Sequence, residues 1–243
     1  MQQLELNKIP EETFLKPIKT YLRLGKLVEL FVSHELRTHQ NISILKENLQ
    51  IQQEKLTLGE IDALLLIDNK PVHLEIVYKF YVYDATVGSS ELEHWIGPNR
   101  KDSFIEKIMK LKNKQLPLLH LPETLPYLKK LDLNVNNIKQ MVLFKAQLFV
   151  PYQSNSIDFK LLNKDCVAGI FLKMKDLKQF VTCKFYIPNK SDWLQKPNPQ
   201  VTWIDYHVFN IELLPLSKNK IAPLVWIKNP KGNLTKAFIV WWE

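Results

Sequence analysis

Two long apolar runs joined by a short polar segment restrict what this chain can fold into more than any other feature. They lie in LTLGEIDALLLIDNKPVHLEIVYKFY, residues 56–81. The runs are rich in β-branched and aromatic residues, which predicts strands at about Leu58–Ile67 and Val72–Tyr83. Asp68-Asn69-Lys70-Pro71 has the residue types of a tight reversal. The sequence therefore predicts a central β-hairpin.

Four charged residues interrupt this hairpin, although charged side chains are seldom buried unless they are paired, bind metal or do chemistry. They are Glu60, Asp62, Glu75 and Lys79. If Ile67 pairs with Val72, Glu60 lies opposite Lys79 and Asp62 opposite Val77. Side chains alternate between the faces of a strand, so this register places all four on one face.

Carboxylates that meet beside a lysine suit a hard divalent cation, Mg²⁺ or Mn²⁺. Such an ion lowers the pKa of a bound water and neutralises charge on a phosphate, and a lysine orients the water. The plainer alternative is a surface ion pair of Glu60 or Glu75 with Lys79. His73 lies on the same face as Glu75 and is either a ligand or, more simply, a hydrogen-bonded structural histidine.

The segments around the hairpin alternate between helical and extended patterns. Residues 11–38 have helical spacing of apolar residues, and residues 49–52 alternate like the start of a strand. A helix is expected over Asp102–Gln115, capped by Asp102 or Ser103. The second half is rich in predicted strands, in IKQMVLFKAQLFVPY, CVAGIFLKM, VTCKFYI, TWIDYHVFNIEL and KAFIVWWE.

The net charge of +8 suits a polyanionic partner such as nucleic acid. Arg100, just before the predicted helix, and Lys107, Lys110 and Lys114 along it would give a row of positive charge for a phosphate backbone. A solvated helix face is the alternative. Cys166 and Cys183 form no metal-type pair, and neither a signal-peptide pattern nor an apolar run of about 18 residues occurs. These features predict a cytoplasmic protein with reduced thiols and no membrane segment.

The order of these motifs resembles a known family. LGKLVELF, LGEID, HLEIVYKFY and WIGPNRKDSFIEKIMKLKNKQL together are similar to the bacterial family described as domain of unknown function 1853. That family is regarded as similar to the PD-(D/E)XK nuclease superfamily. The resemblance is dense over residues 20–120, and Asn99, Asp102, Lys107 and Gln115 are among its motif positions.

The resemblance implies roles for individual residues. Asp62 matches the superfamily's metal-binding aspartate and Glu75 its following acid, while Glu29 falls where such nucleases place an accessory acid. The superfamily lysine should stand two residues after the acid, where this chain has Val77. Lys79 is four residues beyond Glu75, about 13 Å along a strand, so it could replace a lysine at position 77 only with a bulge or a different position of the metal.

We therefore expect an α/β (α+β) protein with a restriction-endonuclease-like mixed sheet flanked by helices and a strand-rich C-terminal extension or lobe. The expected division is a nuclease-like core over 1–128 and a strand-rich region over 129–243, continuous with the core or separate. The expected function is metal-dependent hydrolysis of phosphodiester bonds in DNA or RNA. Its expected residues are Asp62 and Glu75 as ligands of Mg²⁺ or Mn²⁺, Glu29 and Glu60 as accessory acids, and Lys79 or Lys107 beside the attacking water.

Two alternatives stay open. The first is a module of nuclease fold that binds nucleic acid or protein without turnover. The second is a structural protein whose sheet carries an ion pair.

Overall fold

The computed structural model describes residues 1–6, 22–153 and 157–243. The chain forms two compact units. Unit 1 comprises Met1–Tyr78 and Lys107–Lys145, and unit 2 comprises Lys79–Glu106 and Ala146–Glu243. The predicted division into domains at residue 128 stays a prediction.

The central hairpin is present, and its strands are β3 (Leu56–Ile67) and β4 (Lys70–Tyr83). Its turn is shorter than predicted. Asp68 and Asn69 have φ angles of 49° and 61°, as the two central residues of a type I′ turn require. Ile67 consequently pairs with Lys70 and Leu65 with Val72, so the predicted pairing of Ile67 with Val72 is wrong by two residues. A shift of two keeps every side chain on its predicted face.

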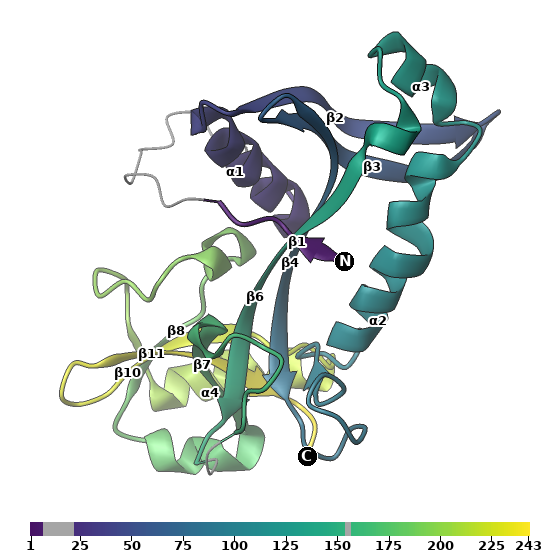
Figure 1. Ribbon diagram of the computed structural model, residues 1–243. Helices are drawn as coiled ribbons and strands as arrows, with labels where there is room; N and C mark the ends of the chain where they lie inside the picture. The colour runs from purple at the N-terminus through teal and green to yellow at the C-terminus, as the bar shows by residue number, and fades with distance from the viewer. Residues whose placement is uncertain (7–21, 154–156) are drawn as a thin grey trace. The chain divides into compact units, whose positions relative to one another are not determined.

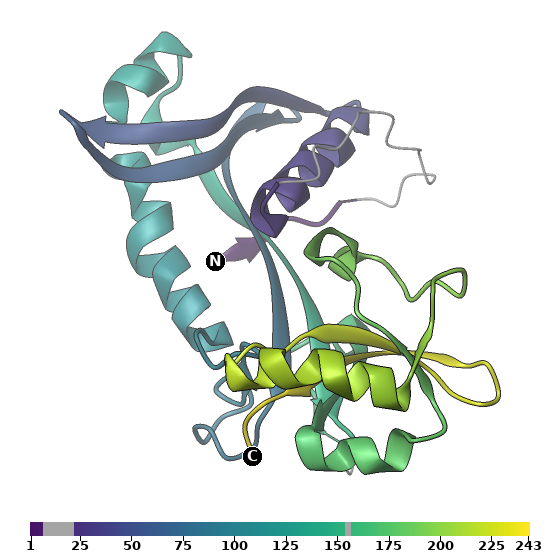
Figure 2. The ribbon, with the colours of Figure 1, turned by 180° about the vertical axis from the view of Figure 1, so that it is seen from behind.

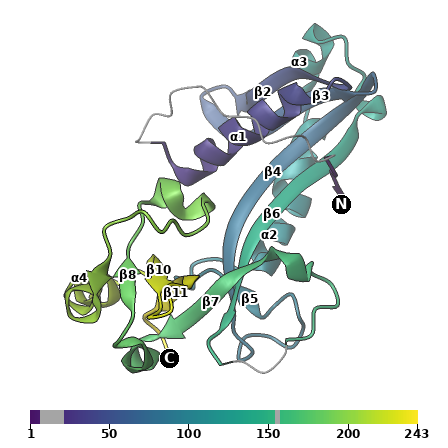
Figure 3. The same ribbon diagram turned by 90° about the vertical axis from the view of Figure 1, so that its left-hand side faces the viewer.

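Unit 1 is a mixed sheet with helices. Its sheet has the order β2-β3-β4-β6, and β1 pairs with β6 in parallel. Figure 1 shows α1 beside the strongly curved strands β2 and β3, and Figure 3 shows the long strands β4 and β6 side by side. The remaining bounds are β1 (Gln2–Gln3), α1 (Leu24–Thr38), β2 (Ile42–Gln53) and β6 (Lys139–Pro151).

Helix α1 buries Leu27, Val28, Val32 and Leu36, spaced three to four residues apart as an amphipathic helix requires. It confirms the second part of the predicted helical region. Residues 11–21 of that region lie outside the described residues.

A run of helices of changing period follows β4 and β5. The predicted helix over Asp102–Gln115 is confirmed in position, but only its first part is α-helical. The run comprises α2 (Phe104–Lys110), a π-helix (Leu111–Gln115), a 3₁₀ helix (Leu116–His120), α3 (Leu125–Lys130) and a 3₁₀ turn (Val135–Asn137). Leu118, Leu119 and Leu128 pack on Ile51 and Ile61 of the sheet.

Unit 2 contains the strand-rich second half of the chain. Its sheet continues from β4 and β6 in the order β7-β11-β10-β8-β9. The bounds are β5 (Trp95–Ile96), β7 (Val167–Lys173), β8 (Lys184–Tyr186), β9 (Ile204–Asp205), α4 (Tyr206–Lys218), β10 (Leu224–Lys228) and β11 (Leu234–Val240), with 3₁₀ helices at Lys164–Cys166, Met174–Phe180 and Lys190–Leu194. The strands β7 and β11 are parallel, whereas β10 and β11 are antiparallel.

One predicted strand of this half is wrong. Within TWIDYHVFNIEL only Ile204–Asp205 is a strand, β9, and the residues from Tyr206 onward form the start of helix α4, which Figure 2 shows along the β10–β11 sheet. Asp205 caps this helix, because its carboxylate accepts the Val208 N–H at 3.0 Å. Phe209 and Leu213, four residues apart, pack into the core against Val225. Strand β10 is an element that the sequence analysis missed.

The molecule is thus a mixed α/β protein with a large mixed sheet and flanking helices. No helix in the described ranges combines the length and apolarity needed to span a bilayer.

Candidate functional site

Two carboxylates of unit 1 lie on one face of the central hairpin. The pairing of β3 with β4 ends at Ala63 and Leu74, and Asp62 and Glu75 are the next residues on the two strands. Glu75 is fully buried. Asp62 accepts the Ile76 N–H at 2.8 Å through Oδ2, which holds its carboxylate against β4.

The closeness of these carboxylates changes the chemistry of Asp62. Burial and the negative charge of Glu75 raise the pKa of Asp62 to about 7, and Glu29 adds a smaller effect in the same direction. The Ile76 N–H and the Lys107 ammonium lower this pKa but only in part offset the increase. Near neutral pH, Asp62 is therefore divided between its protonated and charged forms.

Glu75 is held by a chain of polar side chains. His73 Nε2 lies 2.9 Å from Glu75 Oε1, and Gln115 Nε2 donates to Glu75 Oε2 at 2.5 Å. The amide oxygen of Gln115 in turn accepts from Lys107 Nζ at 2.7 Å. The π-helical turn that contains Gln115 thus links a helix lysine to a strand carboxylate, and π-turns occur frequently at functional sites.

The tautomer of His73 follows from Gln140 in β6. The Gln140 amide nitrogen lies 2.6 Å from the Leu116 carbonyl oxygen, so this atom must be a donor. The same nitrogen lies 3.0 Å from His73 Nδ1, which therefore accepts. The Nε2–H of His73 is then the donor to Glu75.

The two accessory acids form a separate cluster in unit 1. Lys26 Nζ of α1 contacts Glu29 at 2.7 Å and Glu60 at 2.6 Å, and it donates to Asn48 at 2.8 Å. Burial lowers the pKa of Lys26, but its hydrogen bonds to Glu29 and Glu60 outweigh this effect and raise it overall. Lys26 thus pairs with both acids predicted as accessory ligands, and its one positive charge offsets one of their two negative charges.

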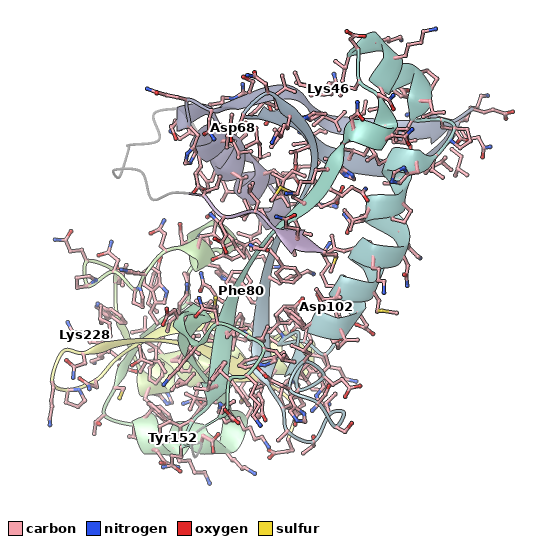
Figure 4. The ribbon with its side chains drawn as sticks, viewed as in Figure 1. Lys46, Asp68, Phe80, Asp102, Tyr152 and Lys228 are labelled. Atoms are coloured by element: carbon pink, nitrogen blue, oxygen red, sulfur yellow. The ribbon has the colours of Figure 1, made fainter. Side chains whose placement is uncertain are left out.

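Two of the predicted basic residues belong to unit 2, where each contacts an acid. Lys79 Nζ lies 2.5 Å from Asp102 Oδ2, and Figure 4 labels Asp102 at the start of α2. Arg100 pairs with Asp84 and lies 4.2 Å from the centre of the Trp242 ring. The predicted capping role falls to Ser103, whose hydroxyl accepts the Glu106 N–H.

The WIGPN motif has a structural role in unit 2. Trp95 is fully buried, Pro98 accepts the Trp242 indole N–H at 2.9 Å, and Asn99 accepts the Ala222 N–H at 2.7 Å. A side chain at Gly97 would collide with Asp102. The motif therefore fastens the loop before α2 to the C-terminal segment.

Sequence reasoning missed Lys26, Asn48 and Gln140. Lys26 of α1 meets Asn48 of β2, 22 residues away in the chain, and Gln140 of β6 meets His73 of β4, 67 residues away, so no local pattern in the sequence marks either contact. Lys110 and Lys114 are exposed on the helical run, as a phosphate-binding or solvated face requires.

The donor set limits the kind of metal site. Among residues 1–6, 22–153 and 157–243, no group of three or more His, Cys, Asp or Glu side chains is placed to hold an ion. Asp62 and Glu75 offer two carboxylates, which fits Mg²⁺, since this ion keeps several waters and needs one or two protein carboxylates. They do not fit Zn²⁺, which takes three or four protein ligands.

Comparison with known proteins gives one match. The model of a family described as "Domain of unknown function (DUF1853)" matches residues 1–239. Neither the curated proteins nor the solved structures gave a match to this chain.

Proposed function

Since this chain belongs to the family of domain of unknown function 1853, we propose that it is a metal-dependent phosphodiesterase of the PD-(D/E)XK type acting on DNA or RNA. The proposal rests on one observation. Asp62 and Glu75 directly follow the last paired residues of two neighbouring strands, and burial together with the charge of Glu75 raises the pKa of Asp62 to about 7. A divalent cation relieves this repulsion by neutralising both carboxylates.

Lys107 supports the proposal because it supplies the basic group that position 77 lacks. Val77 is buried among Leu111 and Val142, so a lysine could not stand there without disrupting this cluster. Lys107 approaches from the helical run instead, and its charge acts directly on Asp62. We assign to Lys107, rather than Lys79, the role of orienting the attacking water, because Lys79 is engaged by Asp102.

In this proposal, Asp62 and Glu75 would hold Mg²⁺ or Mn²⁺, and the bound ion would supply an acidic water and neutralise charge on the phosphate. His73 and Gln115 keep the Glu75 carboxylate in place. Gln115 also positions Lys107, whose ammonium donates hydrogen bonds to an incoming oxygen. The cluster of Lys26, Glu29 and Glu60 lies outside the metal's immediate ligands and sets the local charge.

Titration of Mn²⁺ into the full chain by calorimetry, followed by incubation with labelled single- and double-stranded DNA and RNA, tests the proposal. We expect binding and cleavage in the wild type and loss of both in Asp62→Asn. Asp68→Asn is the matched control, because it makes the same change on the exposed turn of the same hairpin. Wild-type chain that neither binds Mn²⁺ nor cleaves any of the four substrates contradicts the proposal.

A module that binds nucleic acid without cleavage is the second candidate. Its specific support is that both oxygens of Glu75 already have hydrogen-bond partners. This candidate predicts binding that persists in EDTA and weakens with salt. In that case the double variant Lys110→Gln/Lys114→Gln should lower the slope of log K against log salt by about 1 to 2, whereas Lys129→Gln/Lys130→Gln should not.

A further inference from the structure

A pocket of about 280 Å³ opens in unit 2, and the proposed chemistry of unit 1 makes no use of it. Its size is close to the lower end of small-molecule pockets, about 300 Å³. Its walls combine aromatic rings with charged groups. The lining residues that matter here are Tyr83, Tyr152, Trp242, Asp84, Lys173 and Asp176.

Aromatic neighbours fix the rings of this pocket. Tyr83 packs edge-on against Trp95, with centroids 5.2 Å apart, and Tyr152 against Phe180 at 4.9 Å. Figure 4 labels Tyr152. These contacts hold two rings in place before any ligand arrives, which lowers the entropy cost of stacking a planar ligand on them.

Asp84 provides a negative charge in the pocket wall beside the aromatic rings, and it is only 8% exposed. Its Oδ1 accepts the N–H and the hydroxyl of Thr86, at 3.0 and 2.6 Å, and its Oδ2 contacts Arg100. The Arg100 guanidinium also lies over the Trp242 ring, 4.2 Å from its centre. Arg100 therefore contacts both Asp84 and Trp242 and restricts the movement of all three side chains. Asp84 is therefore a rigid acceptor at the pocket wall.

Asp176 adds a second acceptor. Its Oδ2 accepts the Lys173 N–H at 2.8 Å, which positions the carboxylate at the start of a 3₁₀ helix. A carboxylate has about four acceptor sites, and this bond occupies one of them. Lys173 supplies a flexible donor on the same wall.

We propose that this pocket takes a single unpaired nucleobase carrying an exocyclic amino group: adenine, cytosine or guanine. The aromatic rings stack on the base, which is how proteins hold bases of single strands. Asp84 and Asp176 accept from the amino group, as acidic side chains do from cytosine N4. Uracil and thymine present a carbonyl oxygen at that position, which cannot donate a hydrogen bond to a carboxylate.

The inference names the substrate class of the proposed function and rests on it. Nucleosides isolate the base from the phosphate, and EDTA removes any contribution of a metal. We expect adenosine and cytidine to bind the full chain in ligand-observed NMR and calorimetry, with uridine weaker by about tenfold, from the loss of one specific base contact.

Asp176→Asn is the decisive variant. An asparagine oxygen can still accept the Lys173 N–H, so the helix start is preserved, while the amide can now donate to a uracil carbonyl. We expect the preference for cytidine over uridine to fall by about tenfold or to reverse. Asp165→Asn makes the same charge change on an exposed residue of unit 2 outside the pocket and should leave the preference unchanged.

Tyr152→Leu should weaken all nucleosides alike, because it removes a stacking surface and no hydrogen bond; thermal melting verifies that each variant is folded. Equal binding of cytidine and uridine to the wild type overturns the inference, as does an unchanged preference in Asp176→Asn. Binding of an aliphatic diamine but of no nucleoside also overturns it. Cleavage without nucleoside binding removes this inference alone, and nucleoside binding without cleavage removes only the proposed hydrolysis.

Discussion

At the scale of single residues, Asp62 couples the chemistry of unit 1 to its stability. Its folded-state pKa of about 7 lies above the value near 3.9 of an unfolded chain. Between these values the folded chain binds more protons than the unfolded chain, so the free energy of unfolding falls as pH rises from about 4 through 7. A carboxylate pair that binds a cation is thus expected to destabilise the metal-free protein at neutral and higher pH.

Asp62→Asn should remove this decrease in the free energy of unfolding with pH, because asparagine keeps the hydrogen bond from the Ile76 N–H but carries no charge. In EDTA, the stability of the variant relative to wild type should increase by about 2 kcal/mol between pH 5 and pH 8. Urea unfolding at several pH values measures it. Asp68→Asn serves as the control, and a difference between Asp62→Asn and wild type that does not depend on pH would contradict the assignment.

Lys236 in unit 2 is expected to change stability with pH in the direction opposite to Asp62. It is 5% exposed, and its ammonium donates to Gln147 Oε1 and to the carbonyls of Trp193 and Gln195, at 2.6, 2.5 and 2.9 Å. Burial lowers its pKa to about 8. Since the unfolded chain holds this proton up to higher pH, the group makes the free energy of unfolding rise by about 1 kcal/mol between pH 7 and pH 9.

Lys236→Met should abolish this rise, and Lys228→Met is the control because Lys228 is a partly exposed lysine of the neighbouring strand β10. The measurement is urea unfolding of wild type and both variants at pH 7, 8 and 9. A wild-type profile that Lys236→Met leaves unchanged would show that Lys236 titrates at its ordinary pKa.

Predictions for single residues were correct where they depend on the alternation of side chains along a strand. Strand alternation and the assumed pairing of Ile67 with Val72 predicted Asp62 and Glu75 on one face, and the observed register, shifted by two residues, keeps them on one face. The partners of these acids depend on contacts between distant segments. Gln140 lies 67 residues after His73 in the chain, so the sequence gives no local signal that these two side chains meet.

At the scale of elements, the turn of the central hairpin sets the register on which the carboxylate pair depends. Asp68 and Asn69 both have positive φ, which asparagine and glycine tolerate and β-branched residues do not. Asn69→Val should therefore destabilise the protein by roughly 1–2 kcal/mol, and Asn69→Gly should be neutral or stabilising. Lys70→Val, at the exposed next position, is the control, and thermal or urea unfolding measures all three.

The register of the central hairpin and the strand predicted in place of α4 were the element-level errors, and they have different causes. Asp68, Asn69 and Pro71 are residue types common in turns and so predict a four-residue turn, yet Lys70 already pairs with Ile67. In α4, the β-branched and aromatic residues favoured a strand, but the Asp205 cap and the burial of Phe209 and Leu213 decide for a helix. Tertiary packing overrode propensity there.

At the scale of the whole molecule, neither unit is a continuous segment. Unit 1 needs Lys107–Lys145 as well as Met1–Tyr78, and unit 2 needs Lys79–Glu106 as well as the C-terminal half. Composition along the chain cannot reveal this arrangement, because the strands β4 and β6 each belong in part to both units. The expected boundary at residue 128 rests on the higher strand content predicted for the second half of the chain, and strand content alone does not show which segments pack together.

If each unit needs segments from both sides of residue 128, neither half of the chain should fold by itself. Separate expression of 1–128 and 129–243 tests this expectation. Fragment 1–128 lacks the first part of β6, including the buried residues Met141, Val142 and Leu143, so unit 1 loses a sheet neighbour of β4. We expect neither fragment alone to show the cooperative urea transition of the full chain, because each leaves apolar surface without its partner. An equimolar mixture should recover cooperative unfolding. A sharp transition in isolated 1–128 would instead establish it as an independent domain, and the catalytic proposal could then be tested on that fragment alone.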